Sequence, residues 1–233
     1  MSTAAALKEP VAHPSPWPLV RAAVRANVLP GVLLWVGLAL FLAGYFLIPA
    51  VPAVLDEWVA LKTEWGALCN FVTYGVFAVA VPELLQRTLL RQGSRMPLNW
   101  GELGWAALVW GVMGVVVNCF YLAQSHWFGE GNDALTLVKK MAVDQFIFSQ
   151  FANFLVIGLL GWRELGFSAR AWTRLADPVY LWGQYLPIMV AGWCVWIPAV
   201  MVVYFMPTPL QFPVVSMVLS YWILVFKFLR LRR

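Results

Sequence analysis

The longest uncharged stretch of this chain covers residues 178–226 and reads PVYLWGQYLPIMVAGWCVWIPAVMVVYFMPTPLQFPVVSMVLSYWILVF. It is too long for one membrane-spanning helix, because about 20 residues rising ~1.5 Å each already cross the hydrocarbon core of a bilayer. Past its middle, Pro207 and Pro209 remove backbone hydrogen-bond donors and favour a turn. The stretch therefore predicts a tight hairpin of two membrane-spanning helices, at 186–206 and 212–228.

Apolar stretches of spanning length occur four more times before this hairpin. They cover residues 28–50, 66–86, 104–124 and 141–161. Composition agrees, since 62% of the residues are hydrophobic and 12% are charged, whereas about 25% are charged in an ordinary soluble domain. We therefore predict an all-α fold, an integral membrane bundle of about six transmembrane helices without a soluble domain.

We expect a short tail outside the helical bundle at each end of the chain. Four prolines within residues 1–27 predict an irregular tail rather than a helix. The apolar run that follows is too long for a signal-peptide core, so we expect one transmembrane domain over 28–229 and a basic tail over 230–233. Cys69, Cys119 and Cys194 each lie in an apolar segment, and we expect them to be buried.

The basic residues predict the orientation of the bundle, because cytoplasmic loops retain Lys and Arg. With six spans, thirteen of the sixteen Lys and Arg residues share one side. They are Lys8, Arg21, Arg25, Arg87, Arg91, Arg95, Arg163, Arg170, Arg174, Lys227, Arg230, Arg232 and Arg233. The other side receives Lys62, Lys139 and Lys140. We therefore expect both termini on the cytoplasmic side of a bacterial plasma membrane, with a mitochondrial inner or peroxisomal membrane as the alternative.

The third expected span carries small or polar residues at alternating spacings of three and four. Gly104, Gly111, Gly114 and Asn118 belong to this pattern, which places them on one helix face. Small residues let helices approach closely in lipid, so we predict a helix-packing seam at the three glycines. A face that borders a water-filled pore is the alternative.

The fourth expected span carries a polar stripe. Gln145, Ser149 and Asn153 follow one another at intervals of four residues, so they share a helix face. Such a stripe is unfavourable toward lipid and is expected to face the bundle interior or a wet cavity. We predict these residues, together with Asp144 and Asn118, as candidate polar lining.

Asp144 and Glu83 are acids inside expected spans, which makes both of them functional candidates. By the expected bounds each lies within one turn of a span end, on opposite sides of the membrane, so we do not expect a catalytic pair. Asp144 either attracts cations at the outer mouth of a pathway or caps its helix and pairs with Lys139 or Lys140. Glu83 is expected to pair with Arg87, four residues later.

Enzymatic, metal-binding and nucleic-acid-binding functions find little support in the residues. The two histidines, His13 and His126, lie in the tail and at an expected membrane interface, so no Ser/His/Asp arrangement is indicated. Clusters of His and Cys and a phosphate-binding glycine loop are also lacking. We therefore expect no enzyme, catalytic residue, metal or cofactor. The expected partners are the lipid bilayer and a small solute or ion, without nucleic acid, and homo-oligomers are left open.

Several motifs of the second half of the chain form a joint pattern. Lys140, Asp144 and Gln145 fit a Lys-x-x-x-Asp-Gln signature, and the segment 114–121 begins with Gly and ends with Tyr. The hairpin adds a Trp-x-x-Trp-Pro block, a later Pro and a later Trp, which are Trp193, Trp196, Pro198, Pro207 and Trp222. From Gly114 onward the chain thus resembles the family of small membrane proteins named after MPV-seventeen and peroxisomal membrane protein twenty-two.

The resemblance implies a divergent member with an added N-terminal helix at 28–50. Two departures are Gln211, where the family has an arginine, and Gln150, where it has a proline. The family implies a channel-like role in solute passage and membrane homeostasis, with no enzyme active site. Our leading hypothesis is therefore a permeability pathway for small solutes or ions. A structural or assembly protein is the alternative, and a membrane-bound transferase is a distant third.

Overall fold

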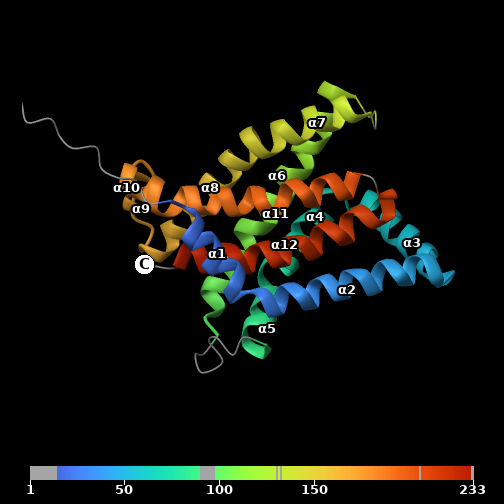
Figure 1. Cartoon of the computed structure of the whole chain (residues 1–233), viewed down its shortest axis with the longest axis horizontal. Coiled ribbons are helices and arrows are strands. Elements are labelled where there is room, and N and C mark those ends of the chain that lie inside the picture. Colours follow the sequence, from blue (N-terminus) through green and yellow to red (C-terminus); the bar gives the residue numbers. More distant parts are fainter. Residues whose placement is uncertain (1–14, 90–97, 130, 132, 205, 232–233) are drawn as a thin grey trace, which may run out of the picture.

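The structure is a computed structural model and describes residues 15–89, 98–129, 131, 133–204 and 206–231. Among these residues the regular elements are all helical, which confirms the predicted all-α fold (Figure 1). Six helical runs are long and apolar enough to cross a membrane, and this confirms the predicted number of spans. They are Val28–Leu47, Ala67–Thr88, Trp100–Phe128, Ala134–Glu164, Pro178–Tyr204 and Pro209–Leu231.

Three of the six spans consist of α-helical pieces joined through a π-helical turn. The second span joins α4 (Ala67–Gly75), η1 (Val76–Ala80) and α5 (Val81–Thr88). The fourth joins α7 (Ala134–Val143), η2 (Asp144–Phe148) and α8 (Ser149–Glu164), and the fifth joins α10 (Pro178–Tyr180), η3 (Leu181–Tyr185) and α11 (Leu186–Tyr204). The remaining helices are α1 (Trp17–Ala26), α2 (Val28–Leu47), α3 (Ala50–Trp65), α6 (Trp100–Phe128), α9 (Arg170–Leu175) and α12 (Thr208–Leu231).

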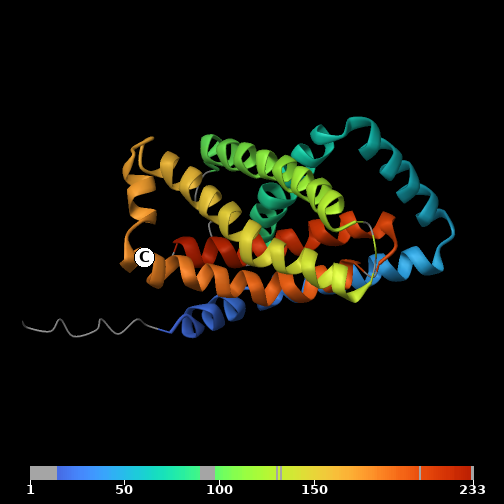
Figure 2. The ribbon, with the colours of Figure 1, turned by 90° about the horizontal axis from the view of Figure 1, so that it is seen from above.

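Five of the spans form a closed ring. Helix α6 packs against α4 on one side and α8 on the other, and α7 with η2 contacts α11. Helix α11 packs against α12, which returns to η1 and α5 and so closes the ring. Helices α1 and α2 lie outside the ring against α12, as Figure 2 shows. Because both its faces are covered, α12 is the most deeply buried span.

The two ends of the bundle differ in what they contain. Helix α1 packs against α11 and α12, and the Gln184 side chain donates a hydrogen bond of 2.7 Å to the backbone oxygen of Arg230 near the end of α12. We call this end, where α1 begins and α12 finishes, the terminal end (Figure 1). The opposite end, crossed by α3 and holding the turn between α11 and α12, is the loop end. That the terminal end faces the cytoplasm stays a prediction.

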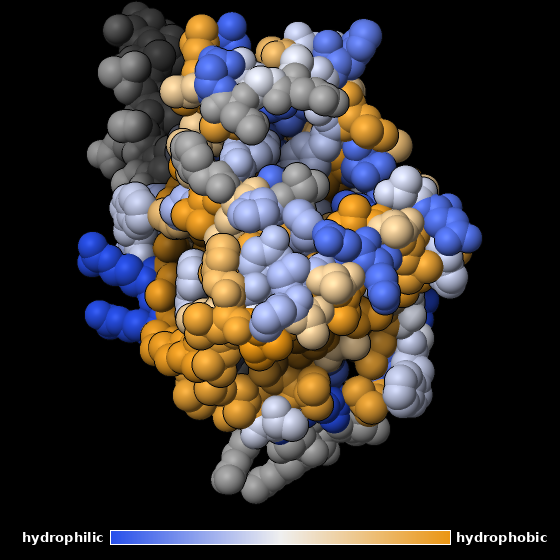
Figure 3. All heavy atoms as spheres, turned by 90° about the vertical axis from the view of Figure 1, so that its right-hand side faces the viewer, coloured by the Kyte–Doolittle hydropathy of each residue, from blue (hydrophilic) through white to orange (hydrophobic). Residues whose placement is uncertain are grey.

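The outer surface of the bundle is largely apolar. Large exposed hydrophobic residues include Leu40, Leu84, Leu122 and Ile147 on four different spans. Viewed from the loop end, Figure 3 shows polar residues gathered over the middle of the face and hydrophobic residues covering much of its lower part and sides. This distribution fits a multi-pass membrane protein whose sides contact lipid.

Three expectations about buried residues and chain ends are corrected. Cys119 and Cys194 are exposed, so the predicted burial is right for Cys69 alone. Residues 17–26 form helix α1 instead of an irregular tail, because Pro16 precedes the helix and Pro18 lies in its first turn, where no backbone donor is needed. Residues 1–14 of that predicted tail lie outside the described residues.

The segments between the spans are also more helical than predicted. Helix α3 follows the first span directly and begins at Ala50, with Pro49 before it and Pro52 in its first turn. At the other end of the chain α12 continues to Leu231, so the predicted basic tail begins no earlier than residue 232. Residues 232–233, like Arg91 and Arg95 of the predicted basic loop, lie outside the described residues.

Candidate functional site

A small cavity of about 80 Å³ lies inside the ring, which we call the central cavity. The four residues predicted from the fourth span all line it, and they are Asp144, Gln145, Ser149 and Asn153. Tyr74 from α4 and Tyr121 from α6 line the facing wall. The polar stripe thus faces the interior of the bundle rather than lipid, and the amide of Asn153 additionally donates to the backbone oxygen of Ser149 at 2.8 Å.

Asp144 is the only carboxylate among the described residues that line the central cavity. Its Oδ2 atom accepts hydrogen bonds from Tyr121 Oη at 3.4 Å and from Gln145 Nε2 at 3.2 Å. The side chain is almost completely buried, and within the described residues no lysine or arginine nitrogen lies within 4.0 Å of it. A buried acid without a cationic partner is costly inside a membrane and is a functional candidate for that reason.

The helix that carries Asp144 begins earlier than the predicted span. The fourth span begins at Ala134, and Asp133 caps it by accepting a hydrogen bond of 3.0 Å from the backbone nitrogen of Thr136. Asp144 therefore lies ten residues into the span, about 15 Å along the helix. It neither caps the helix nor pairs with Lys139 or Lys140 among the contacts of the described residues. The expected span began too late because these two lysines lie inside the helix.

The π-helical turn η2 fixes the position of the polar stripe. A π-turn shifts the backbone pairing by one residue, which leaves the carbonyl of Gln145 available. This oxygen accepts hydrogen bonds from Trp193 Nε1 of α11 at 3.1 Å and from Gln150 Nε2 at 3.2 Å. Turn η1 is similar, since Ser220 Oγ of α12 donates to the Phe77 oxygen at 2.8 Å. These turns have no clear signal in the sequence and were not predicted from it.

A larger cavity of about 480 Å³ opens from the loop end, and we call it the loop-end cavity. It shares five lining residues with the central cavity, so the two lie next to each other. They are Tyr74, Val117, Tyr121, Trp196 and Val215. Polar residues predominate farther out, where Asn118, Gln124 and Ser125 line the wall. The predicted lining residue Asn118 thus belongs to this outer cavity.

The charged residues that line the loop-end cavity, within the described part of the chain, are Lys62 and Lys140. Lys62 projects from α3, and its Nζ atom lies 4.2 Å from the centroid of the Phe212 ring. Burial lowers the pKa of Lys62 below its usual value, although the neighbouring Cys69 raises it. Helix α3 therefore places Lys62 in the wall of the loop-end cavity, a position that was not predicted from the sequence.

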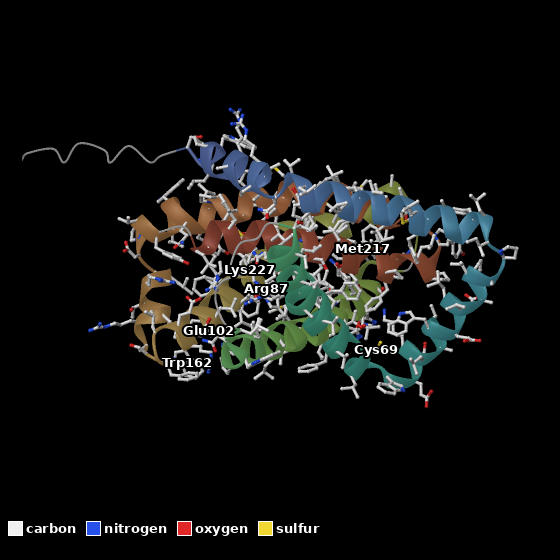
Figure 4. The ribbon with its side chains drawn as sticks, turned by 90° about the horizontal axis from the view of Figure 1, so that it is seen from below. Cys69, Arg87, Glu102, Trp162, Met217 and Lys227 are labelled. Carbon is white, nitrogen blue, oxygen red and sulfur yellow. The ribbon has the colours of Figure 1, made fainter. Side chains whose placement is uncertain are left out.

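A third cavity of about 390 Å³ lies at the terminal end, and we call it the terminal-end cavity. Its walls carry Glu83, and the predicted pair with Arg87 is confirmed at 2.7 Å. Lys227 of α12 also lies 3.3 Å from Glu83, which the sequence did not predict. Figure 4 shows Arg87, Lys227 and Glu102 grouped on this half of the molecule, with Cys69 toward the loop end. Asp144 and Glu83 thus line separate cavities.

An apolar layer separates the terminal-end and central cavities. Trp110 is the lining residue that both of them share. Its ring meets Phe226 edge-on at a centroid distance of 5.8 Å, and Phe226 lies 5.9 Å from Trp222. These three aromatic side chains are buried in the main core. The layer closes the interior of the ring toward the terminal end.

The glycines of α6 differ in their surroundings. A Cβ atom added at Gly114 would lie 2.7 Å from the Asn70 backbone oxygen, and one added at Gly111 would lie 2.7 Å from the Phe71 ring. These two glycines let α6 approach α4 closely. Gly104 lies outside this contact, since an added Cβ would meet nothing within 4 Å there.

Comparison of the chain with protein-family models, curated proteins and solved structures found no match. The resemblance to the MPV-seventeen family therefore stays a prediction. The geometry of the cavities is the basis on which a function can be proposed. Among the described residues, no group of three or more His, Cys, Asp or Glu side chains lies close enough to hold a metal ion.

Proposed function

We propose that this protein is a gated permeability pathway for small polar solutes or ions, closed in the present conformation. The observation that supports the proposal is the series of cavities inside the ring. The loop-end cavity borders the central cavity at five shared lining residues, and the central cavity borders the terminal-end cavity at Trp110. The proposed route thus runs from one end of the bundle to the other and is interrupted by one apolar layer.

The chemistry of the walls supports a wet route. Polar groups inside a membrane protein need partners or water. Asn118, Ser125 and Ser149 are partly buried and line the cavities with no side-chain donor bond among the described contacts. A constriction of apolar side chains can block ions and water by dewetting, without filling the whole route. In the proposal Trp110 and Phe226 form this gate.

The alternative is a structural or assembly protein, and one observation favours it. Polar groups of the fourth span also join helices, because Trp193 bonds the Gln145 oxygen and Tyr185 Oη donates to the Gln150 oxygen at 2.8 Å. Interhelical hydrogen bonds are a common use of polar residues in membranes. A flux measurement separates the two functions, since only the pathway predicts that opening the aromatic layer raises conductance.

The test uses liposomes that contain purified full-length protein, in which uptake of a small ion or solute is measured. We expect Trp110→Ala to raise flux at least about tenfold, the effect of lowering a barrier by about 1.4 kcal/mol. Trp35→Ala is the matched control, because Trp35 lies on α2 and is 61% exposed on the outer surface. Equal flux from wild type and both variants, at equal folded yield, would favour the structural function.

A further inference from the structure

Not every basic side chain in the wall of the terminal-end cavity is paired with an acid. Its described walls carry Arg87, Arg163, Lys227 and Arg230 against Glu83, Glu102 and Glu164. Glu83 is held by Arg87 and Lys227, and Glu164 pairs with Arg230 at 2.8 Å. Arg163 has no described carboxylate oxygen within 4.0 Å. Among the described residues, the cavity wall therefore has one cation, Arg163, and one acid, Glu102, that form no ion pair.

The guanidinium of Arg163 has few partners: its central carbon lies 6.0 Å from the centroid of the Phe167 ring, a cation–π contact. Its Nε atom is buried and has no hydrogen-bond partner among the described residues. A Cβ added at Gly101 would lie 2.6 Å from Arg163 Nη2, so the guanidinium lies directly against the first turn of α6. The amino end of a long helix carries a partial positive charge. The guanidinium thus meets a helix end whose first turn also carries the acid Glu102.

We propose that the terminal-end cavity binds a phosphate-bearing anion, with Arg163 as its principal contact and Lys227 and Arg230 as further cations. A guanidinium presents two parallel N–H donors, which match two oxygens of a phosphate group. In the first turn of α6 the Glu102 nitrogen already donates to Asn99 Oδ1 at 3.2 Å, so the proposed phosphate contacts come from side chains. The volume of about 390 Å³ suits a small organic phosphate or a lipid headgroup, since ligand pockets commonly hold about 300–1,000 Å³.

The proposed site does not depend on conduction. Binding is measured on the full chain in a neutral detergent or in nanodiscs, where no flux is involved. The soluble probe is inorganic pyrophosphate, and its affinity is measured by calorimetry with chloride at equal ionic strength as the reference. The lipid probe is phosphatidic acid in nanodiscs, compared with phosphatidylcholine, and its effect is measured as the shift in thermal unfolding temperature.

Arg163→Gln removes the charge and keeps a polar side chain of similar shape. We expect it to weaken binding of the effective probe at least about tenfold, the loss of about 1.4 kcal/mol. Arg170→Gln is the matched control, because Arg170 is exposed on α9 and does not line the cavity. It should bind as wild type does. Arg163→Lys keeps the charge but loses the two parallel N–H donors, so its affinity for the probe should lie between those of Arg163→Gln and Arg170→Gln. It also replaces Arg163→Gln as the test variant if that protein folds poorly.

The outcomes separate the two sources of phosphate. Pyrophosphate binding that Arg163→Gln weakens assigns the site to a free phosphate compound, whereas stabilisation by phosphatidic acid alone, lost in the variant, assigns it to a headgroup. The proposal is overturned if neither probe binds wild type more strongly than its reference. It is also overturned if Arg163→Gln and Arg163→Lys both bind as tightly as Arg170→Gln.

Discussion

Asp144 combines three properties that rarely occur together in a membrane span. It is 4% exposed, its described partners are the neutral Tyr121 and Gln145, and it lies beside a cavity. Removing one member of a buried ion pair usually destabilises a protein, because it leaves a charge unpaired. Among the described residues, no cation would be left unpaired if Asp144 lost its charge. The charge can therefore be removed with little loss of stability.

We therefore expect Asp144→Asn to change flux through the reconstituted protein while the thermal unfolding temperature stays equal or rises. The amide keeps an oxygen that accepts from Tyr121 Oη, so the loss from hydrogen bonding stays within about 1 kcal/mol. Asp133→Asn is the control, since Asp133 is an exposed helix cap and Asn caps helices as well as Asp does. Wild-type flux from Asp144→Asn, in an assay where the wild type conducts, would count against a role in the pathway.

At the level of single residues, the sequence predicted the direction of side chains better than their position along a helix. The spacing of Gln145, Ser149 and Asn153 was enough to predict that they face inward, because helical periodicity decides the face. It could not place Asp144 along the span, since charged residues usually mark a span boundary and here two lysines lie inside the helix. The contact of Asp144 with Tyr121 joins two spans, and nothing in the sequence pairs two such distant positions.

Among the helices, the contact of α6 with α4 depends on two glycines. Gly114→Ala places a Cβ 2.7 Å from the Asn70 oxygen, and that oxygen is backbone and cannot move aside easily. We expect a loss of about 1–3 kcal/mol in stability, as overpacking typically causes. Thermal unfolding in detergent measures the effect. Gly104→Ala in the same helix is the control and should be neutral or slightly stabilising, so an equal loss at both positions would contradict the close packing.

The hydrogen bond between Trp193 and the Gln145 oxygen joins α11 to the π-turn of the fourth span. Trp193→Phe keeps an aromatic ring beside Phe146, whose ring centroid lies 5.5 Å away, but removes the donor. We expect a loss of about 1 kcal/mol and a change in flux, because η2 positions Asp144 and Gln145. Trp35→Phe on the outer surface should change neither quantity. If the two variants unfold alike, the Gln145 oxygen has found another partner.

The sequence predicted all six spans but not the helices between them. Long apolar runs identify spans because lipid leaves the backbone few alternatives to a helix. Helices α1 and α3 contain prolines in their first turns, and a cluster of prolines resembles a break in the helical pattern. A proline breaks a helix only past its first turn, so composition alone could not decide these segments. The π-turns depend on contacts between spans and are invisible to periodicity.

For the whole molecule, the proposed pathway depends on the closed ring of five spans more than on the number of helices. A ring encloses an interior, and three cavities occupy it. The sequence suggested a polar lining but could not show which spans face one another, since the charge rule gives orientation and no packing order. Cations lie at both ends of the proposed route: Lys62 of α3 and Lys140 line the loop-end cavity, and Arg163 lines the terminal-end cavity.

Water access along this route is measurable with single cysteines in a chain lacking Cys69, Cys119 and Cys194. A charged, membrane-impermeant thiol reagent should label Asn118→Cys fastest, because Asn118 lines the wide loop-end cavity. Asn153→Cys, beside the central cavity, should react more slowly and should gain reactivity when Trp110→Ala is added. The control Phe151→Cys shares a helix with Asn153 but is 62% exposed on the outer surface, where lipid excludes a charged reagent. Labelling of Asn118→Cys no faster than Phe151→Cys would mean that the cavities are dry, and the polar residues would then serve only to join helices.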